Sequence, residues 1–134
     1  YKINEEVIAW IQAFLDNRKQ RVHINGIFSQ WASVLSGVPH GSILGPLLFI
    51  IYINDLVEAC NNGSNIFLYA DDAKIFKHIL TETDKIALQK DLDSACTWTE
   101  RWLLKLNVNK CKFVSYGRNY DYQANYTLHE GVGK

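Results

Sequence analysis

Two adjacent aspartates, Asp71 and Asp72, lie between two short strand patterns, and this feature constrains the fold more than any other in the sequence. Residues 65–69 are mostly apolar, and residues 73–79 carry apolar side chains at intervals typical of a strand. Because so few residues separate the two patterns, they predict a tight antiparallel hairpin with both carboxylates at its turn.

Apolar residues at helical spacing predict helices before this hairpin. One covers residues 5–16, with Asn4 as its N-cap. Another is largely buried, covers residues 47–60 and is entered through Pro46, because the first helical turn tolerates proline.

A long amphipathic helix is predicted after the hairpin, with a cap at Thr81 or Thr83 and an end near Leu106. Two of its tryptophans lie four residues apart, a spacing more typical of a core face than of a base-stacking platform. The residues expected on its inner side are Ile86, Leu88, Leu92, Ala95, Trp98, Trp102 and Leu103.

A second hairpin is predicted earlier in the chain, where residues 21–24 alternate and residues 27–34 return after the turn pair Asn25 and Gly26. Residues 112–116 are a further strand candidate. The sequence shows no repeat, low-complexity tract or linker, so we expect one α+β unit in which antiparallel hairpins pack on helices.

The composition excludes several classes of protein. With 134 residues, 48% of them hydrophobic, the chain suits one packed domain and is not typical of disorder. Its three cysteines cannot form a closed disulfide framework, and they indicate a reducing, intracellular compartment without separating cytoplasm from nucleus. The longest apolar run, residues 47–53, is far shorter than a membrane span, so we expect no membrane partner.

Charge and methionine content add two further constraints. The 14 basic and 14 acidic side chains balance, so the total gives no sign of a nucleic-acid partner. Residues 101–118 nevertheless hold five basic residues and no acid, which is either a phosphate contact or a solvated face. The sequence contains no methionine and begins with Tyr1, and we therefore expect a piece of a longer protein.

The adjacent carboxylates of Asp71 and Asp72 have two interpretations. Aspartates are ordinary turn residues. Crowded like charges are also what a divalent metal such as Mg²⁺ requires, and two such ions can clamp the oxygens of a phosphoryl transfer. Neighbouring residues on an extended backbone point to opposite faces, which argues against a glycosidase pair across a sugar.

A glycine-rich loop over residues 37–46 is the second candidate site. Its three glycines allow close approach of a ligand, and the loop leads into a helix N-terminus, where phosphate or sugar binds readily. It lacks the Gly-Lys-Ser/Thr ending of a P-loop, and a plain glycine-rich connector is the alternative interpretation.

Taken in order, these motifs resemble the reverse transcriptase domain of non-LTR retrotransposons and, more distantly, group II intron enzymes. The likeness covers roughly residues 7–118. Four segments carry it: the entry segment with Trp10, Phe14, Arg21, Asn25 and Gly26; the glycine loop and helix with Leu47, Leu48, Phe49, Tyr52, Asn54 and Asp55; the turn Tyr69, Ala70, Asp71 and Asp72; and the following element with Trp98, Trp102, Asn107, Lys110 and Cys111.

The resemblance implies roles for matching residues in RNA-directed DNA polymerisation. Asp71 and Asp72 would be catalytic ligands of Mg²⁺, and Tyr69 would lie close to the primer end. Lys110, or less readily Lys112, would donate a proton to the pyrophosphate, although either also fits a solvated surface. The partners implied are an RNA template, a DNA primer and deoxynucleoside triphosphates. The residues that would bind the incoming nucleotide are Gly37, Pro39, His40, Gly41 and Ser42.

The sequence departs from the family in two respects. The family draws another catalytic aspartate from an earlier strand, whereas the acids before the glycine loop here are Glu5, Glu6 and Asp16, all in or at the end of the first helix. His40 stands where the family usually has glutamine, and the donor and acceptor geometries of the two side chains differ.

We therefore expect a partial reverse transcriptase palm that lacks its first catalytic strand. Residues 1–36 would be the fingers-side helix and hairpin, residues 37–118 the palm, and residues 119–134 a weakly patterned tail. The chain alone should be inactive without the rest of the polymerase: the upstream palm strand, fingers and thumb. The alternative is a non-catalytic remnant that acts at most as a weak nucleic-acid-binding or interaction module.

Overall fold

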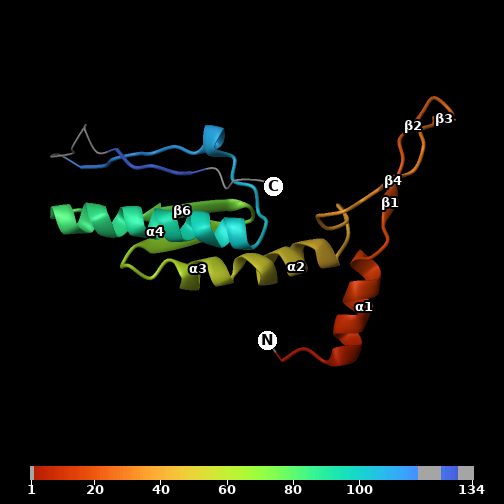
Figure 1. The fold of residues 1–134 in the computed structure, drawn as a ribbon, viewed down its shortest axis with the longest axis horizontal. Coiled ribbons are helices and arrows are strands. Elements are labelled where there is room, and N and C mark those ends of the chain that lie inside the picture. The colour runs from red at the N-terminus through yellow and green to blue at the C-terminus, as the bar shows by residue number, and fades with distance from the viewer. Residues whose placement is uncertain (1, 118–124, 130–134) are drawn as a thin grey trace. The chain divides into compact units, whose positions relative to one another are not determined.

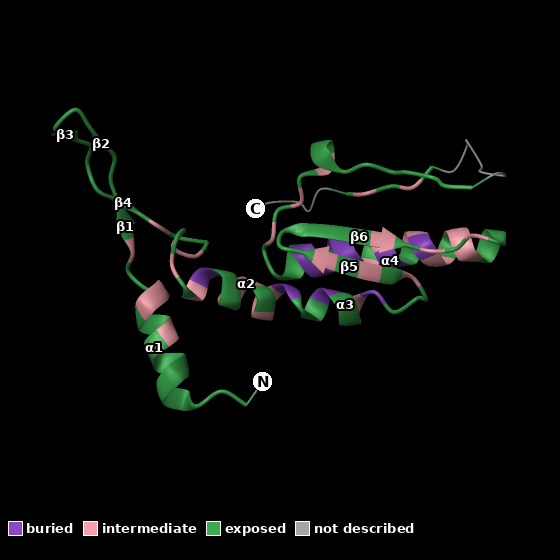
Figure 2. Cartoon of the chain, turned by 180° about the vertical axis from the view of Figure 1, so that it is seen from behind, coloured by how far each residue is buried: buried purple, intermediate pink, exposed green. Residues whose placement is uncertain are grey.

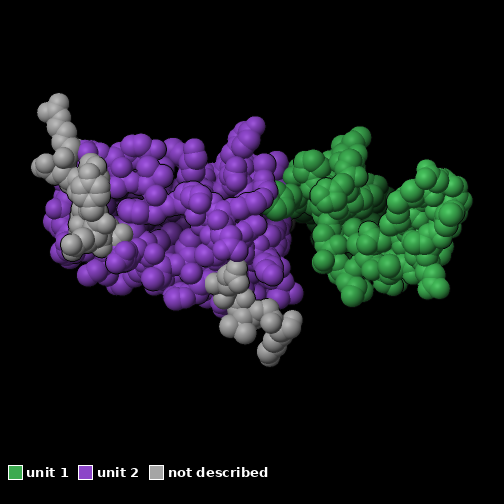
Figure 3. Space-filling view, turned by 90° about the horizontal axis from the view of Figure 1, so that it is seen from above, with its two compact units in different colours: residues 1–49 green, residues 50–134 purple. Residues whose placement is uncertain are grey.

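The computed structural model describes residues 2–117 and 125–129. The single unit predicted from the sequence is wrong, because the chain divides into two compact units, residues 1–49 and residues 50–134, which are coloured separately in Figure 3. Helices and small antiparallel sheets are both present, so the fold is α+β as predicted. Within the described residues, no helix is both long enough and apolar enough to span a lipid bilayer.

The first unit begins with helix α1, Glu5–Leu15. The predicted N-cap is confirmed, because the Asn4 side chain accepts a hydrogen bond from the backbone N–H of Glu6 at 2.8 Å. None of the residues of α1 is buried. The helix is therefore held by its cap and its own backbone bonds rather than by a core within the unit.

The predicted hairpin at Asn25 and Gly26 is present, and both residues have positive φ (49° and 80°), as the turn requires. Its strands are shorter than predicted and occur in two pairs. Strand β2, His23–Ile24, pairs with β3, Ile27–Phe28, and β1, Lys19–Gln20, pairs with β4, Ala32–Ser33. The ladder is interrupted at Val22 and Ser29. The Ser29 hydroxyl oxygen accepts a hydrogen bond from the N–H of Val22, and the N–H of Ser29 donates to the Val22 carbonyl.

The helix predicted over residues 47–60 begins earlier and is broken. Helix α2 covers Leu44–Ile53, and helix α3 covers Asp55–Ala59. The early start follows from Ser42, whose Oγ accepts a hydrogen bond from the N–H of Gly45 at 3.0 Å and so caps the first turn.

The second unit is built on helix α4, Glu82–Arg101, against which α3 and a β-hairpin pack (Figure 1). The hairpin consists of β5, Asn65–Tyr69, and β6, Asp72–Phe76. Figure 2 shows most of the buried residues on α4, with others along α2 and α3. The apolar core is formed by Ile53, Leu56, Cys60, Leu88, Ala95, Cys96 and Trp98.

The inner face of α4 is only partly as predicted. Leu88, Ala95 and Trp98 are buried, whereas Ile86, Trp102 and Leu103 are exposed. Trp98 therefore belongs to the core rather than to a stacking platform.

Helix α4 also ends earlier than expected. Leu103 adopts a left-handed conformation with φ of 57°, and the N–H of Leu104 bonds the carbonyl of Thr99 at 2.9 Å. This is the hydrogen-bond pattern of a Schellman motif, which stops a helix even though no glycine marks the position.

The segment after α4 contains a short 3₁₀ helix, η1, Val108–Lys110. The predicted strand over residues 112–116 is wrong, because these residues form no strand ladder. Of the predicted tail, residues 119–124 and 130–134 lie outside the described residues. The remaining part is held to α4 by Gln89, whose side chain bonds both the N–H and the carbonyl of Thr127 at 3.0 Å.

Candidate active site

The β5–β6 hairpin places three of the predicted site residues together. Tyr69 and Asp72 are directly opposite each other in the ladder, so their side chains share one face of the hairpin, and Asp71 lies in the turn. The turn is tight because Ala70 adopts a positive φ of 50°. All three site residues are exposed, and Tyr69 has 83% of its surface accessible.

Neither aspartate of the turn has a hydrogen-bond or ion-pair partner among the described residues. Two like charges are thus held side by side without a local interaction that compensates for them. Ordinary turn aspartates commonly bond a nearby backbone N–H, which these carboxylates do not do. Their oxygens are therefore free to bind a ligand from solution.

The hairpin is fixed from behind by its other face. Ile66, Leu68 and Ile75 are half-buried on the side that packs on α4, whereas Phe67 and Phe76 lie on the exposed side with their ring centroids 5.0 Å apart. The alternation of burial along β5 keeps the register, since a shift of one residue would expose the inner side chains.

The glycine loop belongs to the first unit. Gly37 and Gly41 have φ of 73° and 78°, so both need the left-handed conformation that glycine adopts most easily. Arg18 holds the loop by donating hydrogen bonds to the carbonyls of Ser36 and Gly37, at 3.3 and 2.5 Å.

The predicted nucleotide-binding residues of this loop differ in accessibility. Gly37, His40 and Gly41 are exposed, whereas Pro39 and Ser42 are half-buried. The Ser42 hydroxyl donates to the carbonyl of Pro39 at 2.8 Å and also caps α2. A structural role therefore accounts for Ser42, while the exposed backbone of the loop is available to a ligand.

Lys110, the predicted proton donor, is exposed at the end of η1. Its N–H bonds the carbonyl of Asn107 at 2.9 Å, which fixes its backbone. The alternative, Lys112, is also exposed. Their exposure is equally consistent with a solvated surface lysine, so the assignment stays a prediction.

A further carboxylate, Asp91, was missed by the sequence analysis. It lies on α4 with none of its surface exposed, and it binds the chain between α3 and β5. One carboxylate oxygen accepts from the N–H and the side-chain amide of Asn62 at 2.8 and 2.9 Å, and the other accepts from the N–H of Ser64 at 3.0 Å. We call Asp91, Asn62 and Ser64 the Asp91 clamp. The sequence did contain a signal for this residue, because Asp91 is an acid within the apolar stripe of the predicted helix.

Burial raises the pKa of Asp91, but its contacts with Ser64 and Asn62 lower it by more, so its pKa lies below that of a free aspartate. The neighbouring Cys60 shows the opposite effect. Burial, with smaller contributions from Asp91 and Cys96, raises the pKa of the Cys60 thiol to about 11. Cys60 is therefore a protonated core thiol, and its sulfur donates to the backbone carbonyl of Asp91 at 3.3 Å.

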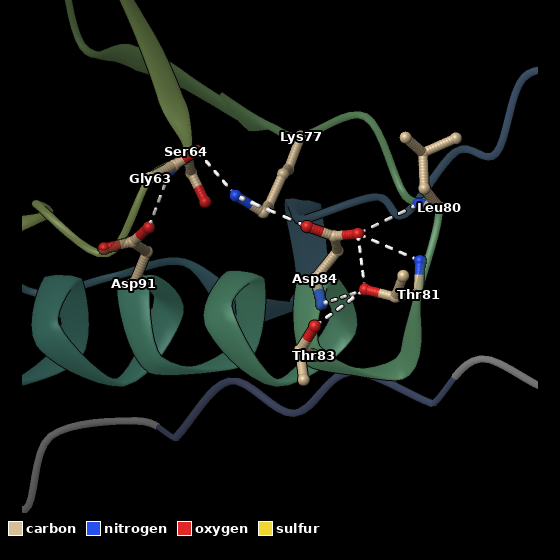
Figure 4. Close-up of polar contacts among 8 residues, drawn as sticks. All are labelled: Gly63, Ser64, Lys77, Leu80, Thr81, Thr83, Asp84 and Asp91. Atoms are coloured by element: carbon tan, nitrogen blue, oxygen red, sulfur yellow. Dashed lines mark hydrogen bonds and ion pairs between the residues drawn. The ribbon is translucent and has the colours of Figure 1, made fainter.

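The start of α4 is secured by a second polar network (Figure 4). Thr81 and Asp84 form a capping box, in which the Asp84 carboxylate accepts from the N–H groups of Leu80 and Thr81 at 3.1 and 2.9 Å. The hydroxyl of Thr81, followed by these backbone bonds, lowers the pKa of Asp84. Lys77 lies 3.8 Å from Asp84 and donates to the Gly63 carbonyl at 2.8 Å, so it connects this cap to the loop of the Asp91 clamp.

Comparison with known proteins identifies the family. The family model for reverse transcriptase (RNA-dependent DNA polymerase) matches residues 1–127. The chain is 32% identical over 115 residues to the RNA-directed DNA polymerase from mobile element jockey of Drosophila melanogaster, an alignment that covers 79% of this chain and 12% of that protein. The jockey protein of Drosophila funebris is 31% identical over 123 residues, with 85% of this chain and 13% of the relative covered.

A third relative is the probable RNA-directed DNA polymerase from transposon BS of Drosophila melanogaster, which is 30% identical over 109 residues and covers 75% of this chain and 12% of that protein. The chain thus spans about an eighth of the length of the curated relatives it matches. No solved structure matches it significantly. Together, the family match over residues 1–127 and the retrotransposon relatives show that the chain belongs to the reverse transcriptase (RNA-dependent DNA polymerase) family.

Proposed function

We propose that this chain supplies the metal-binding turn and the nucleotide-binding loop of an RNA-directed DNA polymerase palm. The observation that carries the proposal is the pair of exposed, unpartnered carboxylates at Asp71 and Asp72. The relatives are RNA-directed DNA polymerases. In the reaction of such enzymes, a primer 3′-hydroxyl attacks the α-phosphate of a deoxynucleoside triphosphate.

The donor set fits Mg²⁺ in part. Mg²⁺ in polymerases is typically held by one or two carboxylates together with water and substrate phosphates, and Asp71 and Asp72 offer hard oxygen ligands of that kind. Among the described residues, however, no group of three or more potential ligands comes together. When bound, the metal would neutralise charge that develops on the transferred phosphate.

The residues of the chain have distinct tasks in this proposal. Asp71 and Asp72 present their oxygens at the turn, and Tyr69, on the same hairpin face as Asp72, contacts the primer end. The exposed backbone around Gly37 and Gly41 receives the incoming nucleotide with its template base, near His40. Lys110 donates a proton to the pyrophosphate.

Because the described residues provide only part of the metal site, we expect no polymerase activity from the chain alone. Template-dependent primer extension by the purified chain, lost in Asp71→Ala, would contradict this expectation. The rest of the polymerase is the proposed source of the missing ligands.

The metal-binding turn is tested directly with Mn²⁺, a paramagnetic substitute for Mg²⁺. NMR spectra of the 134-residue chain should show broadening centred on residues 69–73, reversed by excess Mg²⁺. The double variant Asp71→Asn/Asp72→Asn should abolish it, because the turn then presents only neutral amide ligands.

The matched control removes two exposed acids from α3, Asp55→Asn/Glu58→Gln, and should leave the broadening intact. Broadening that survives loss of Asp71 and Asp72, or that centres elsewhere, would overturn the assignment. Such a result would favour the non-catalytic remnant instead.

A further inference from the structure

The segment that contains the first hairpin has an unusual charge distribution. From residue 17 to residue 54 the sequence contains no aspartate or glutamate, although the whole chain has 14. The basic residues of this stretch are Arg18, Lys19 and Arg21, all at the base of the hairpin. The neutral total therefore conceals a positively charged, acid-free segment.

Planar groups gather on one face of this hairpin. His23 and Phe28 are opposite each other in the ladder, and their rings stack with centroids 4.1 Å apart at an interplanar angle of 11°. The guanidinium carbon of Arg21 lies 3.9 Å from the ring centroid of Phe28 and 4.5 Å from that of Trp31. We call Arg21, His23, Phe28 and Trp31 the Arg21 platform.

The Arg21 platform is exposed rather than part of a core. Half of the surface of Phe28 and 60% of that of Trp31 are accessible. Arg18, by contrast, is occupied with the carbonyls of Ser36 and Gly37. The Arg21 guanidinium has no carboxylate partner among the described residues, so its N–H groups remain available while the rings hold its plane in place.

We propose that the Arg21 platform binds single-stranded nucleic acid, with the Arg21 guanidinium on a phosphate and the exposed Trp31 ring stacked on an unpaired base. Aromatic faces next to a positive charge, without nearby acids, are the features with which proteins bind single strands irrespective of sequence. A duplex would fit less well, because its bases are already stacked on one another.

This inference concerns the first unit and does not depend on metal binding at Asp71 and Asp72. Binding can therefore be measured in EDTA, where failure of the platform is distinguishable from failure of the metal site. RNA and DNA single strands share the chemistry that the platform recognises, and the assay separates them.

The test is fluorescence anisotropy of three labelled 12-nucleotide probes titrated with the full chain. The probes are a single-stranded RNA, a single-stranded DNA and a blunt-ended duplex. We expect both single strands to bind more tightly than the duplex. Trp31→Ala should raise Kd for the single strands about tenfold, because a stacking surface is lost. Arg21→Gln should weaken binding and reduce the slope of log K against log salt by about one.

Three further variants separate the platform from general effects. Trp31→Phe keeps a ring and should bind within about threefold of the unchanged chain. Ile24→Thr changes the opposite hairpin face, whose Ile24 is 63% exposed, and should leave Kd unchanged. Lys90→Gln removes an exposed basic side chain of α4, in the second unit, and should also leave Kd unchanged.

Several outcomes would overturn the proposal. They are no measurable single-strand binding, equal binding of the duplex, loss of binding in Lys90→Gln but not in Arg21→Gln, and displacement of the oligonucleotide by polyglutamate at equal charge concentration. The last result would identify an acidic protein surface as the better partner.

Discussion

The aspartate turn and the Asp91 clamp lie in the same unit, yet they use the same side chain in opposite ways. Asp91 is fully buried and accepts three hydrogen bonds from Asn62 and Ser64. Asp71 and Asp72 are exposed and accept none from the described residues. Burial of a carboxylate is tolerated only with such compensation, whereas exposed carboxylates need none.

This contrast separates a carboxylate with a structural role from two carboxylates for which the fold shows none. The Asp91 clamp connects α4 to the chain that enters β5, so its contacts explain why an acid lies in the core. The turn offers no equivalent explanation, and its Ala70 additionally adopts a left-handed conformation that costs stability. Unfavourable local features that no contact offsets are typical of functional sites.

The largest effect is expected at Asp91. Asp91→Ala removes the shared acceptor of the Asn62 and Ser64 N–H groups and leaves a cavity where a fully buried side chain stood, so the free energy of unfolding should fall by about 3–4 kcal/mol. Asp71→Ala removes a charge that has no partner and should change it by less than about 0.5 kcal/mol. Urea unfolding followed by tryptophan fluorescence measures both.

An intermediate variant tests the mechanism of the clamp. Asp91→Asn keeps the shape and one acceptor oxygen but replaces the second acceptor with an amide group. Its free energy of unfolding should therefore lie between that of Asp91→Ala and that of the unchanged chain. Equal stability losses in Asp91→Ala and Asp71→Ala would show that the clamp contributes nothing specific.

The pH dependence of stability should reflect the same carboxylate. Because the pKa of Asp91 is lower in the folded chain than in the unfolded chain, its contribution is present above the unfolded pKa and is lost as pH falls through the folded pKa. The pKa of Asp84 is also lowered in the folded chain, so protonation of Asp84 adds to the loss of stability. Urea midpoints measured between pH 7 and pH 2.5 should therefore decline below about pH 4.

Asp91→Asn tests which group is responsible for this acid transition. Asp91→Asn should show a shallower decline, since the amide does not titrate. An unchanged slope in Asp91→Asn would assign the acid sensitivity to other groups.

The elements that sequence reasoning predicted correctly are those with local signals. Asn25 and Gly26 form the hairpin turn because their backbone conformations suit it. Asn4 caps α1, and Thr81, one of two candidates, caps α4, because their side chains bond backbone N–H groups only a few residues away. The turn at Asp71 was likewise defined by the two short strand patterns around it.

The features that escaped prediction depend on distant or unmarked contacts. The Asp91 clamp joins residues that are 27 and 29 positions apart, which no periodicity reveals. The end of α4 is set by Leu103 in a conformation usually marked by glycine. Asp71, Asp72 and Tyr69 were predicted from local patterns and lie together on the hairpin, whereas no pattern in the sequence marks Ser42 as the residue that caps α2.

The smallest effect is expected at the turn itself. Ala70 has a φ of 50°, a conformation that disfavours residues with a Cβ atom. Ala70→Gly should therefore raise the free energy of unfolding by about 0.5–1 kcal/mol, since the relief of strain exceeds the added entropy of the unfolded chain. Urea unfolding at pH 7 provides the measurement.

Ala73→Gly, at the second residue of β6, is the matched control. Ala73 has no positive φ, so glycine there should only add flexibility and lower stability by about 0.5–1 kcal/mol. If both variants lower stability alike, Ala70 is not strained, and the turn differs from the Asp91 clamp only in its unpartnered carboxylates. If their effects have opposite signs, the hairpin holds its two charges on a backbone that is itself unfavourable, which a purely structural turn would have no reason to retain.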